Sequence, residues 1–113
     1  MTRVLIGEFG AIFRVGLADL LADVGCDILL DDQGPADLFE QAAGSEPDVV
    51  VLDLDRPGAE AMARSLSALL PAVTVIACSS ASAQMRVYPP FHAGESYLSD
   101  LSPDLLVRAS TGT

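Results

Sequence analysis

The chain of 113 residues has no lysine and no tryptophan, and it contains only one histidine and two cysteines. Cys26 and Cys78 are far apart in sequence, neither belongs to a CxxC pair, and His92 is alone, which argues against a zinc site. We therefore expect the cysteines to be reduced, packed thiols of a cytoplasmic protein. No apolar run approaches the length of a membrane span, and no charged leader precedes a long apolar region. Neither a membrane segment nor a signal peptide is expected.

Positive charge is also scarce in this sequence. The six basic residues are all arginines, the acidic residues number 16, and the formal net charge is −10. This charge argues against direct binding of nucleic acid through this chain. Half of the residues are hydrophobic and few are aromatic. The length and composition predict one globular domain over residues 1–113, with an aliphatic core.

Short apolar runs alternate with segments of helical periodicity. The runs predict five strands, at residues 3–7, 27–30, 48–53, 73–78 and 96–98. The spacing of apolar residues predicts helices at 13–24, 35–43 and 62–70, and a last helix that begins after Ser102 and carries Leu105, Leu106 and Val107. Strands that alternate with helices predict the α/β class, with a parallel doubly wound sheet and right-handed crossovers.

The segment between the fourth and fifth predicted strands breaks this rhythm. A helix is expected there, but Tyr88-Pro89-Pro90-Phe91 interrupts it, because neither proline donates an amide and Pro90 restricts Pro89 to extended geometry. Any fourth helix is therefore short, about one or two turns before Tyr88, or missing. The segment is either a sequence-specific loop or a remodelled interaction surface.

The most informative stretch runs from Pro47 to Gly58 and reads PDVVVLDLDRPG. Its β-branched and aliphatic residues predict a strand buried on both faces, which ends at Asp53 and is followed by a Pro-Gly turn. In a wound α/β sheet, ligands and chemistry lie at the carboxyl ends of the strands. Asp53 is therefore expected in a functional position.

This stretch resembles, nearly residue for residue, the PDVVLLDLRMPG-like segment of response-regulator receiver domains, particularly those that precede a LuxR-like helix-turn-helix. Arg3-Val4-Leu5-Ile6, Ala93-Gly94 before Tyr97-Leu98, and Ser102-Pro103-Asp104 extend the resemblance over roughly residues 3 to 109. The resemblance implies a flavodoxin-like sheet of five parallel strands in the order 2-1-3-4-5, here with helix four shortened or missing.

The resemblance also implies roles for individual residues. Asp53 stands at the position that accepts a phosphoryl group from a histidine kinase, and the Asp55 backbone carbonyl stands at a metal-ligand position. Ser79, or Cys78 if the register slips by one, stands at the hydroxyl position that senses the phosphoryl group. Tyr97 matches the rotating switch aromatic.

Two parts of the family's site are missing from this sequence. The adjacent acidic pair after the first strand reads Glu8-Phe9, and a phenyl ring cannot bind Mg²⁺. We expect weak Mg²⁺ binding at most, at Glu8 and Asp53, and no resident metal or other cofactor. Phe9 either plugs the metal position or forms an aromatic wall for an organic ligand.

The second missing part is the lysine at the end of the fifth strand. Asp100 replaces it, or Ser99 in a gapped alignment, and a chain without lysine offers no alternative. A carboxylate beside a phosphoryl group is repelled by about 4 kcal/mol per pair of unit charges at ~4 Å and an effective dielectric near 20. The sequence therefore predicts a degenerate site.

These features favour an atypical receiver domain of a bacterial transcriptional regulator, which acts as a phosphorylation-independent dimerisation module and not as an enzyme. A homodimer is the simplest assembly. A DNA-binding output domain outside this chain is expected to contact DNA at a fixed half-site spacing. The expected interface residues are Pro89, Pro90, Tyr97, Leu101, Leu105 and Val107.

Two other functions stay open. In one, a small metabolite binds in a degenerate acidic pocket; in the other, Asp53 is a weakly active phosphoacceptor of a two-component system. A phosphatase of the haloacid-dehalogenase type is disfavoured, because Arg56-Pro57-Gly58 follows Asp53-Leu54-Asp55 where that motif has a hydroxyl and aliphatic residues. The predicted pocket residues are Glu8, Phe9, Asp53, Asp55, Ser79 and Asp100.

Overall fold

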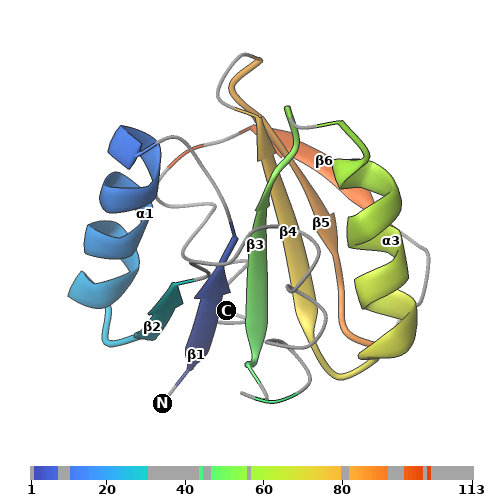
Figure 1. Ribbon diagram of the computed structural model, residues 1–113, viewed down its shortest axis with the longest axis horizontal. Helices are drawn as coiled ribbons and strands as arrows, with labels where there is room; N and C mark the ends of the chain where they lie inside the picture. Colours follow the sequence, from blue (N-terminus) through green and yellow to red (C-terminus); the bar gives the residue numbers. More distant parts are fainter. Residues whose placement is uncertain are drawn as a thin grey trace.

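The computed structural model describes residues 2–7, 11–30, 44, 47–55, 57–79, 82–91, 96–100 and 102. Within these residues, helices α1 (Ala11–Asp23) and α3 (Ala59–Leu69) lie on either side of one mixed sheet (Figure 1). The strands, in chain order, are β1 (Arg3–Ile6), β2 (Asp27–Leu30), β3 (Val49–Asp53), β4 (Thr74–Ser79), β5 (Gln84–Tyr88) and β6 (Tyr97–Asp100).

The sheet has six strands in the order β2-β1-β3-β4-β5-β6. The first four pair in parallel: β1 lies between β2 and β3, and β3 pairs with β4. Strand β5 is antiparallel to β4, and β6 is antiparallel to β5. Strand β6 therefore runs in the same direction as β1, β3 and β4.

The predicted α/β class is confirmed, and β2, β1, β3 and β4 have the predicted order. The predicted sheet of five parallel strands is wrong, because Gln84–Tyr88 forms a strand where the sequence predicts a short or missing fourth helix. Exposed Gln84 and half-buried Arg86 alternate with buried Met85 and Val87, which is the period of a strand. The predicted helices at 35–43 and after Ser102 lie outside the described residues.

Backbone conformation explains where the helices begin and end. Gly25, which the sequence predicts to stop the first helix, has φ +89° and follows α1, and Gly58, just before α3, has φ +77°. These values lie in the left-handed region that glycine adopts without steric cost. Ala83 in the turn between β4 and β5 has φ +52°, an uncommon conformation for alanine.

Alternate residues of each strand face the two helices, and this alternation creates two cores. The α1 side buries Leu17 and Leu21 of the helix against Val4, Ile6, Val49, Val51, Ile76 and Cys78 of the strands. The α3 side buries Ala63 and Leu66 against Leu5, Val50, Leu52, Val75, Ala77 and Tyr88. Burial of each large aliphatic side chain contributes about 1.5–3 kcal/mol, so β3 is stabilised from both faces, as its continuous apolar run predicts.

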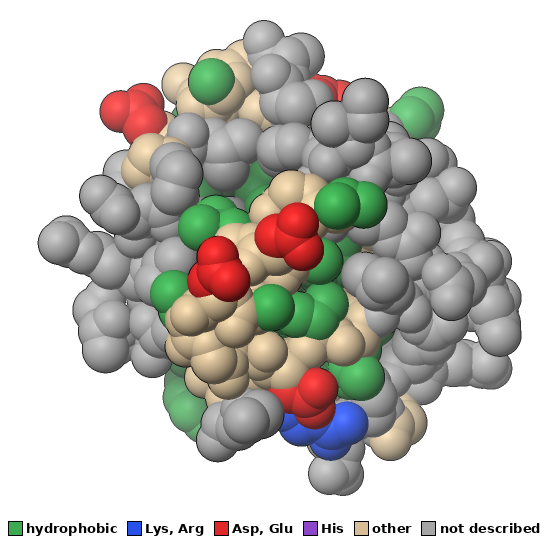
Figure 2. Space-filling view, turned by 90° about the vertical axis from the view of Figure 1, so that its left-hand side faces the viewer, with side chains coloured by type: hydrophobic (Ala, Val, Ile, Leu, Met, Phe, Trp, Pro, Cys, Tyr) green, Lys and Arg blue, Asp and Glu red, His purple; other side chains and the backbone are tan. Residues whose placement is uncertain are grey.

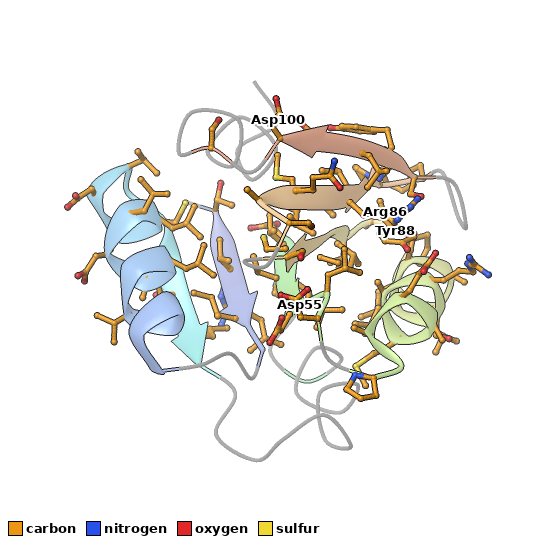
Figure 3. The ribbon with its side chains drawn as sticks, turned by 90° about the horizontal axis from the view of Figure 1, so that it is seen from above. Asp55, Arg86, Tyr88 and Asp100 are labelled. Atoms are coloured by element: carbon orange, nitrogen blue, oxygen red, sulfur yellow. The ribbon has the colours of Figure 1, made fainter. Side chains whose placement is uncertain are left out.

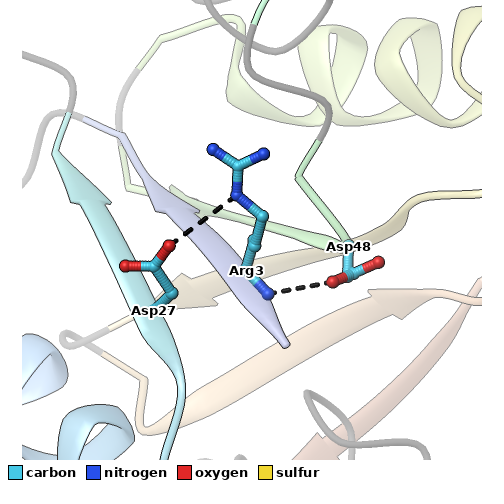
Figure 4. A network of polar contacts seen from close by, with 3 residues as sticks. All are labelled: Arg3, Asp27 and Asp48. Atoms are coloured by element: carbon cyan, nitrogen blue, oxygen red, sulfur yellow. Dashed lines mark hydrogen bonds and ion pairs between the residues drawn. The ribbon is translucent and has the colours of Figure 1, made fainter. Parts of the chain in front are cut away.

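A polar network fixes the amino ends of the parallel strands (Figure 4). The Arg3 amide donates to Asp48 Oδ2 at 2.9 Å, and Arg3 Nε lies 3.8 Å from Asp27 Oδ2. Figure 2 shows the molecule from the α1 side, where the described side chains are largely apolar or acidic and blue cationic atoms lie at one end beside a carboxylate. Arg3 is thus remote from the edge where the candidate site lies, because it stands at the opposite end of β1.

Candidate functional site

The candidate site lies at the edge of the sheet where β1, β3, β4 and β6 end. The shared direction of these strands brings Asp53, Ser79 and Asp100 to the same edge, and Asp55 follows in the turn after β3. Hydrogen bonds bring Asp53, Asp55 and Ser79 together, whereas Asp100 lies on the same edge but farther along the sheet. Glu8 and Phe9, the other two predicted pocket residues, lie outside the described residues.

Ser79 and Asp55 are joined by a short hydrogen bond. The Ser79 hydroxyl donates to Asp55 Oδ1 at 2.6 Å, and its oxygen accepts the Ser82 amide at 3.2 Å. Ser79 is only 4% exposed, whereas Asp55 is exposed to solvent. A hydrogen bond from a hydroxyl to a carboxylate is charge-assisted and strong, so it holds the Ser79 hydroxyl toward the turn after β3.

The turn after β3 is closed by Asp53 itself. The Asp55 amide donates to Asp53 Oδ1 at 3.0 Å, which is the geometry of an Asx turn. Asp53 is half-buried and follows the alternation of Val49 and Val51, so its side chain lies on the α1 side of the sheet. Ser79 follows Val75 and Ala77 on the α3 side. The two predicted site residues therefore approach the acidic turn from opposite faces of the sheet.

Cys78, the alternative to Ser79 in the sequence prediction, has a different environment. It pairs with Asp53 in the sheet register and is fully buried in the core on the α1 side. Burial, and secondly the negative charge of Asp53, raises the pKa of the Cys78 thiol to about 12. The thiol is neutral and inert at physiological pH. The hydroxyl group that meets the acidic turn belongs to Ser79.

The prediction that Asp100 lies beside Asp53 is wrong. Asp53 pairs with Cys78, Cys78 with Met85, and Met85 with Ser99, so three strand spacings separate Asp53 from the end of β6. At roughly 4.8 Å per spacing this distance is about 14 Å. Figure 3 shows Asp55 and Asp100 in separate parts of this edge. The cause is β5, which lies between β4 and β6 and displaces Asp100, and equally Ser99, by one strand.

This displacement changes the electrostatics of the site. The predicted repulsion of about 4 kcal/mol at ~4 Å falls to about 1 kcal/mol at 14 Å for the same dielectric, and salt at physiological strength screens it further because the Debye length is about 8 Å. Asp100 therefore neither assists nor strongly opposes negative charge at Asp53. The position at which the resemblance predicts a lysine therefore contributes little charge of either sign to the site.

The predicted switch and interface residues lie on or near β6. Tyr97 begins this strand and is 51% exposed; its neighbour Leu98 is 53% exposed on the opposite face. Pro89 and Pro90 are half-buried and follow β5 at the end where β6 begins, since Val87 pairs with Tyr97. Leu101, Leu105 and Val107 lie outside the described residues.

Sequence reasoning missed two exposed apolar residues of this region, Leu98 and Phe91, as interface candidates. Phe91, directly after the two prolines, is 75% exposed, and its amide donates to the Pro71 carbonyl at 2.6 Å. This bond joins the segment after β5 to the segment after α3. The proximity of Phe91 to a double proline was the available signal.

Among the described residues, no three acidic, histidine or cysteine side chains lie close enough to hold a metal ion together. The same part of the chain contains no helix with the length and apolar character needed to cross a bilayer.

No protein-family model matches the sequence, and no curated protein matches it.

Proposed function

We propose that this chain is an atypical receiver-like domain, related to the flavodoxin-like fold, that dimerises without phosphorylation in a cytoplasmic bacterial transcriptional regulator. In this proposal it is not an enzyme. It holds together two DNA-binding domains that lie outside this chain. The observation that carries the proposal is the exposure of Tyr97 and Leu98 on β6, the last strand of the described sheet.

An edge strand with exposed apolar side chains is a template for pairing with another chain. Antiparallel pairing of two β6 strands about a two-fold axis is isologous, so the same residues serve both partners. It also suits the charges, because Asp100 of one copy then lies toward the Tyr97 end of the other and the two carboxylates stay apart. Pro89, Pro90 and Phe91, near the start of β6, extend the apolar area available to such a dimer.

The candidate site supports independence from phosphorylation. The chain has no lysine, and Asp100 is remote from Asp53. The Ser79 hydroxyl donates to Asp55, so a phosphoryl group on Asp53 would have to compete for it. Phosphoryl transfer depends on positive charge that stabilises the transferred oxygens. The described residues that meet at this edge supply carboxylates and hydroxyl groups.

Light scattering after size-exclusion chromatography tests the proposal. The wild-type chain should have about twice its mass of 11.8 kDa, and Tyr97→Thr combined with Leu98→Thr should have the monomer mass. Threonine suits a strand and removes most of the apolar surface. Val15→Thr is the matched control, because Val15 is 60% exposed on α1, away from β6, and should leave the dimer intact. A monomeric wild type at millimolar concentration would refute the proposal.

A titration with Mg²⁺ and BeF₃⁻, followed by two-dimensional NMR, tests independence from phosphorylation separately. The amide signals of Asp53, Ser79 and Tyr97 should not move beyond the effect of salt. A saturable shift of all three, together with a change in mass, would instead establish Asp53 as a working phosphoacceptor.

A further inference from the structure

A second polar cluster lies on the α3 side of β5 and is not used by the proposed function. The Arg86 guanidinium donates from Nη1 to Ser96 Oγ at 2.9 Å, and both residues are half-buried. The Tyr88 side chain follows Arg86 on the same face of the strand, since residues two apart point to the same side. Figure 3 shows Arg86 and Tyr88 together, between the β5–β6 pair and helix α3.

The Tyr88 hydroxyl is the one buried side-chain oxygen or nitrogen without a hydrogen-bond partner in the described part of the chain. Tyr88 is only 1% exposed. The Ser96 side chain lies close to the phenol, but the contact falls short of a hydrogen bond of regular geometry. A buried hydroxyl group without a partner is unfavourable, so native structures normally supply one, whether protein, water or ligand.

Arg86 is anomalous in a chain of this composition. Carboxylates outnumber arginines by 16 to six, yet no carboxylate of the described residues forms an ion pair with Arg86. Arg64, by contrast, pairs with Glu60 at 3.6 Å on the surface of α3. A half-buried guanidinium has lost part of its hydration, and a counter-ion normally compensates for that loss.

The charges around the Tyr88 phenol also favour an anionic ligand. Burial raises the pKa of Tyr88, and the positive charges of Arg86 and Arg64 oppose this shift, so both cations act on the hydroxyl. Glu60, which pairs with Arg64, acts in the opposite sense. Arg86 offers several N–H donors, and the Tyr88 and Ser96 hydroxyl groups each have a proton to donate. The cluster is therefore rich in donors, and no carboxylate of the described residues is bonded to it.

We propose that Arg86, Ser96 and Tyr88 form a binding site for a small organic carboxylate. A carboxylate accepts two parallel hydrogen bonds from one guanidinium, and its single negative charge matches the single positive charge of Arg86. A phosphate dianion fits less well, because Arg86 is the one cation of the described cluster without an ion pair and the negative charge of Glu60 also acts on Tyr88. This site is distinct from the Asp53–Asp55–Ser79 group, because it lies on the α3 face of β5; it borders the proposed dimer strand, since Arg86 pairs with Leu98.

Acetate is the probe, titrated at constant ionic strength and followed through the arginine Nε–Hε signals in a ¹H–¹⁵N spectrum. We expect a saturable shift of the Arg86 signal with a millimolar dissociation constant, and a much weaker response to inorganic phosphate or chloride. Arg86→Gln should abolish saturation. Arg3→Gln is the matched control and should retain acetate binding within about threefold, since Arg3 is a partly exposed, ion-paired arginine on β1, away from β5.

Tyr88→Phe gives a second, independent measurement. Loss of a hydrogen bond from the phenol to a charged ligand should weaken acetate binding about tenfold or more, while thermal stability without acetate stays the same or rises. If the wild-type shift is linear and unchanged in Arg86→Gln, the proposal is wrong. It is equally wrong if Tyr88→Phe lowers stability without altering the response to acetate, because the phenol then serves a structural water.

Discussion

Replacing Ser79 with alanine tests the hydrogen bond between Ser79 and Asp55 in the candidate site. The mutation removes the 2.6 Å hydrogen bond to Asp55 and the acceptor of the Ser82 amide. A hydrogen bond to a charged group contributes about 1.5–3 kcal/mol. Asp55 and Ser82 are exposed and can be rehydrated, so the lower end of this range, about 1.5 kcal/mol, is expected.

The corresponding change in melting temperature follows from the size of the chain. An unfolding entropy of about 2.1 cal/mol/K per residue gives about 0.24 kcal/mol/K for 113 residues. A loss of 1.5 kcal/mol should therefore lower the melting temperature by about 6 °C, measured by circular dichroism. Ser79→Thr retains the hydroxyl group and should recover most of the loss.

Ser65→Ala provides the control, because Ser65 is exposed on α3 and its change should stay within about 0.5 kcal/mol. A double-mutant cycle with Asp55→Ala then isolates the pair, and a coupling energy of about 1 kcal/mol is expected. Equal losses for Ser79→Ala with aspartate or alanine at position 55 would show that the hydroxyl does not act through Asp55, and the reasoning about the edge would fail.

Three further outcomes are expected. Gly58→Ala should lower the free energy of unfolding by about 1–2 kcal/mol, because Gly58 has a left-handed conformation. Gly16→Ala, within helix α1, should raise it by up to about 1 kcal/mol. An added Cβ meets no atom within 4 Å at either position, so equal effects in urea unfolding would contradict the argument. The raised pKa of Cys78 stabilises the fold fully below pH 9, and this contribution is lost as the pH rises from 9 toward about 12. Cys78→Ala should therefore flatten the decline of stability in that window, and an unchanged slope would exclude the thiol as its source. Arg3→Gln should lower the free energy of unfolding by less than about 1 kcal/mol, and by less in high salt, because its ion pair with Asp27 is exposed. Asp48→Ala should lower it more, since the Arg3 amide loses its acceptor. The reverse order would refute this interpretation of the network.

The parallel half of the sheet was predicted well from the sequence, because each of those strands is an apolar run with clear limits. Val49 to Leu52 is apolar without interruption, and the structure buries it on both faces. Gly25 was equally informative, since a positive φ at a helix end strongly favours glycine. These signals are local, so neighbouring residues suffice to read them.

Strand β5 escaped prediction because the Pro89-Pro90 pair argues against a helix without arguing for a strand. The alternation of Gln84, Met85, Arg86 and Val87 is too short to outweigh the expected rhythm of the fold. Its consequence for the site was also missed: Asp100 moved away from Asp53. The bond between Ser79 and Asp55 depends on how a turn folds back over the sheet, which spacing alone does not specify.

The two halves of the mixed sheet differ in the sequence distance between paired strands, which is short in the antiparallel half and long in the parallel half. The β4–β5–β6 meander joins near neighbours such as Ser79 and Gln84, whereas β1 must find β3 through pairs such as Val4 and Val49. Closing the shorter loops costs less chain entropy, and hairpins form within about 1–10 μs. The antiparallel half can therefore nucleate early, and the parallel half, with its higher contact order, sets the folding rate. Strand β5, which the sequence did not predict, thus gives this chain a local starting point for folding.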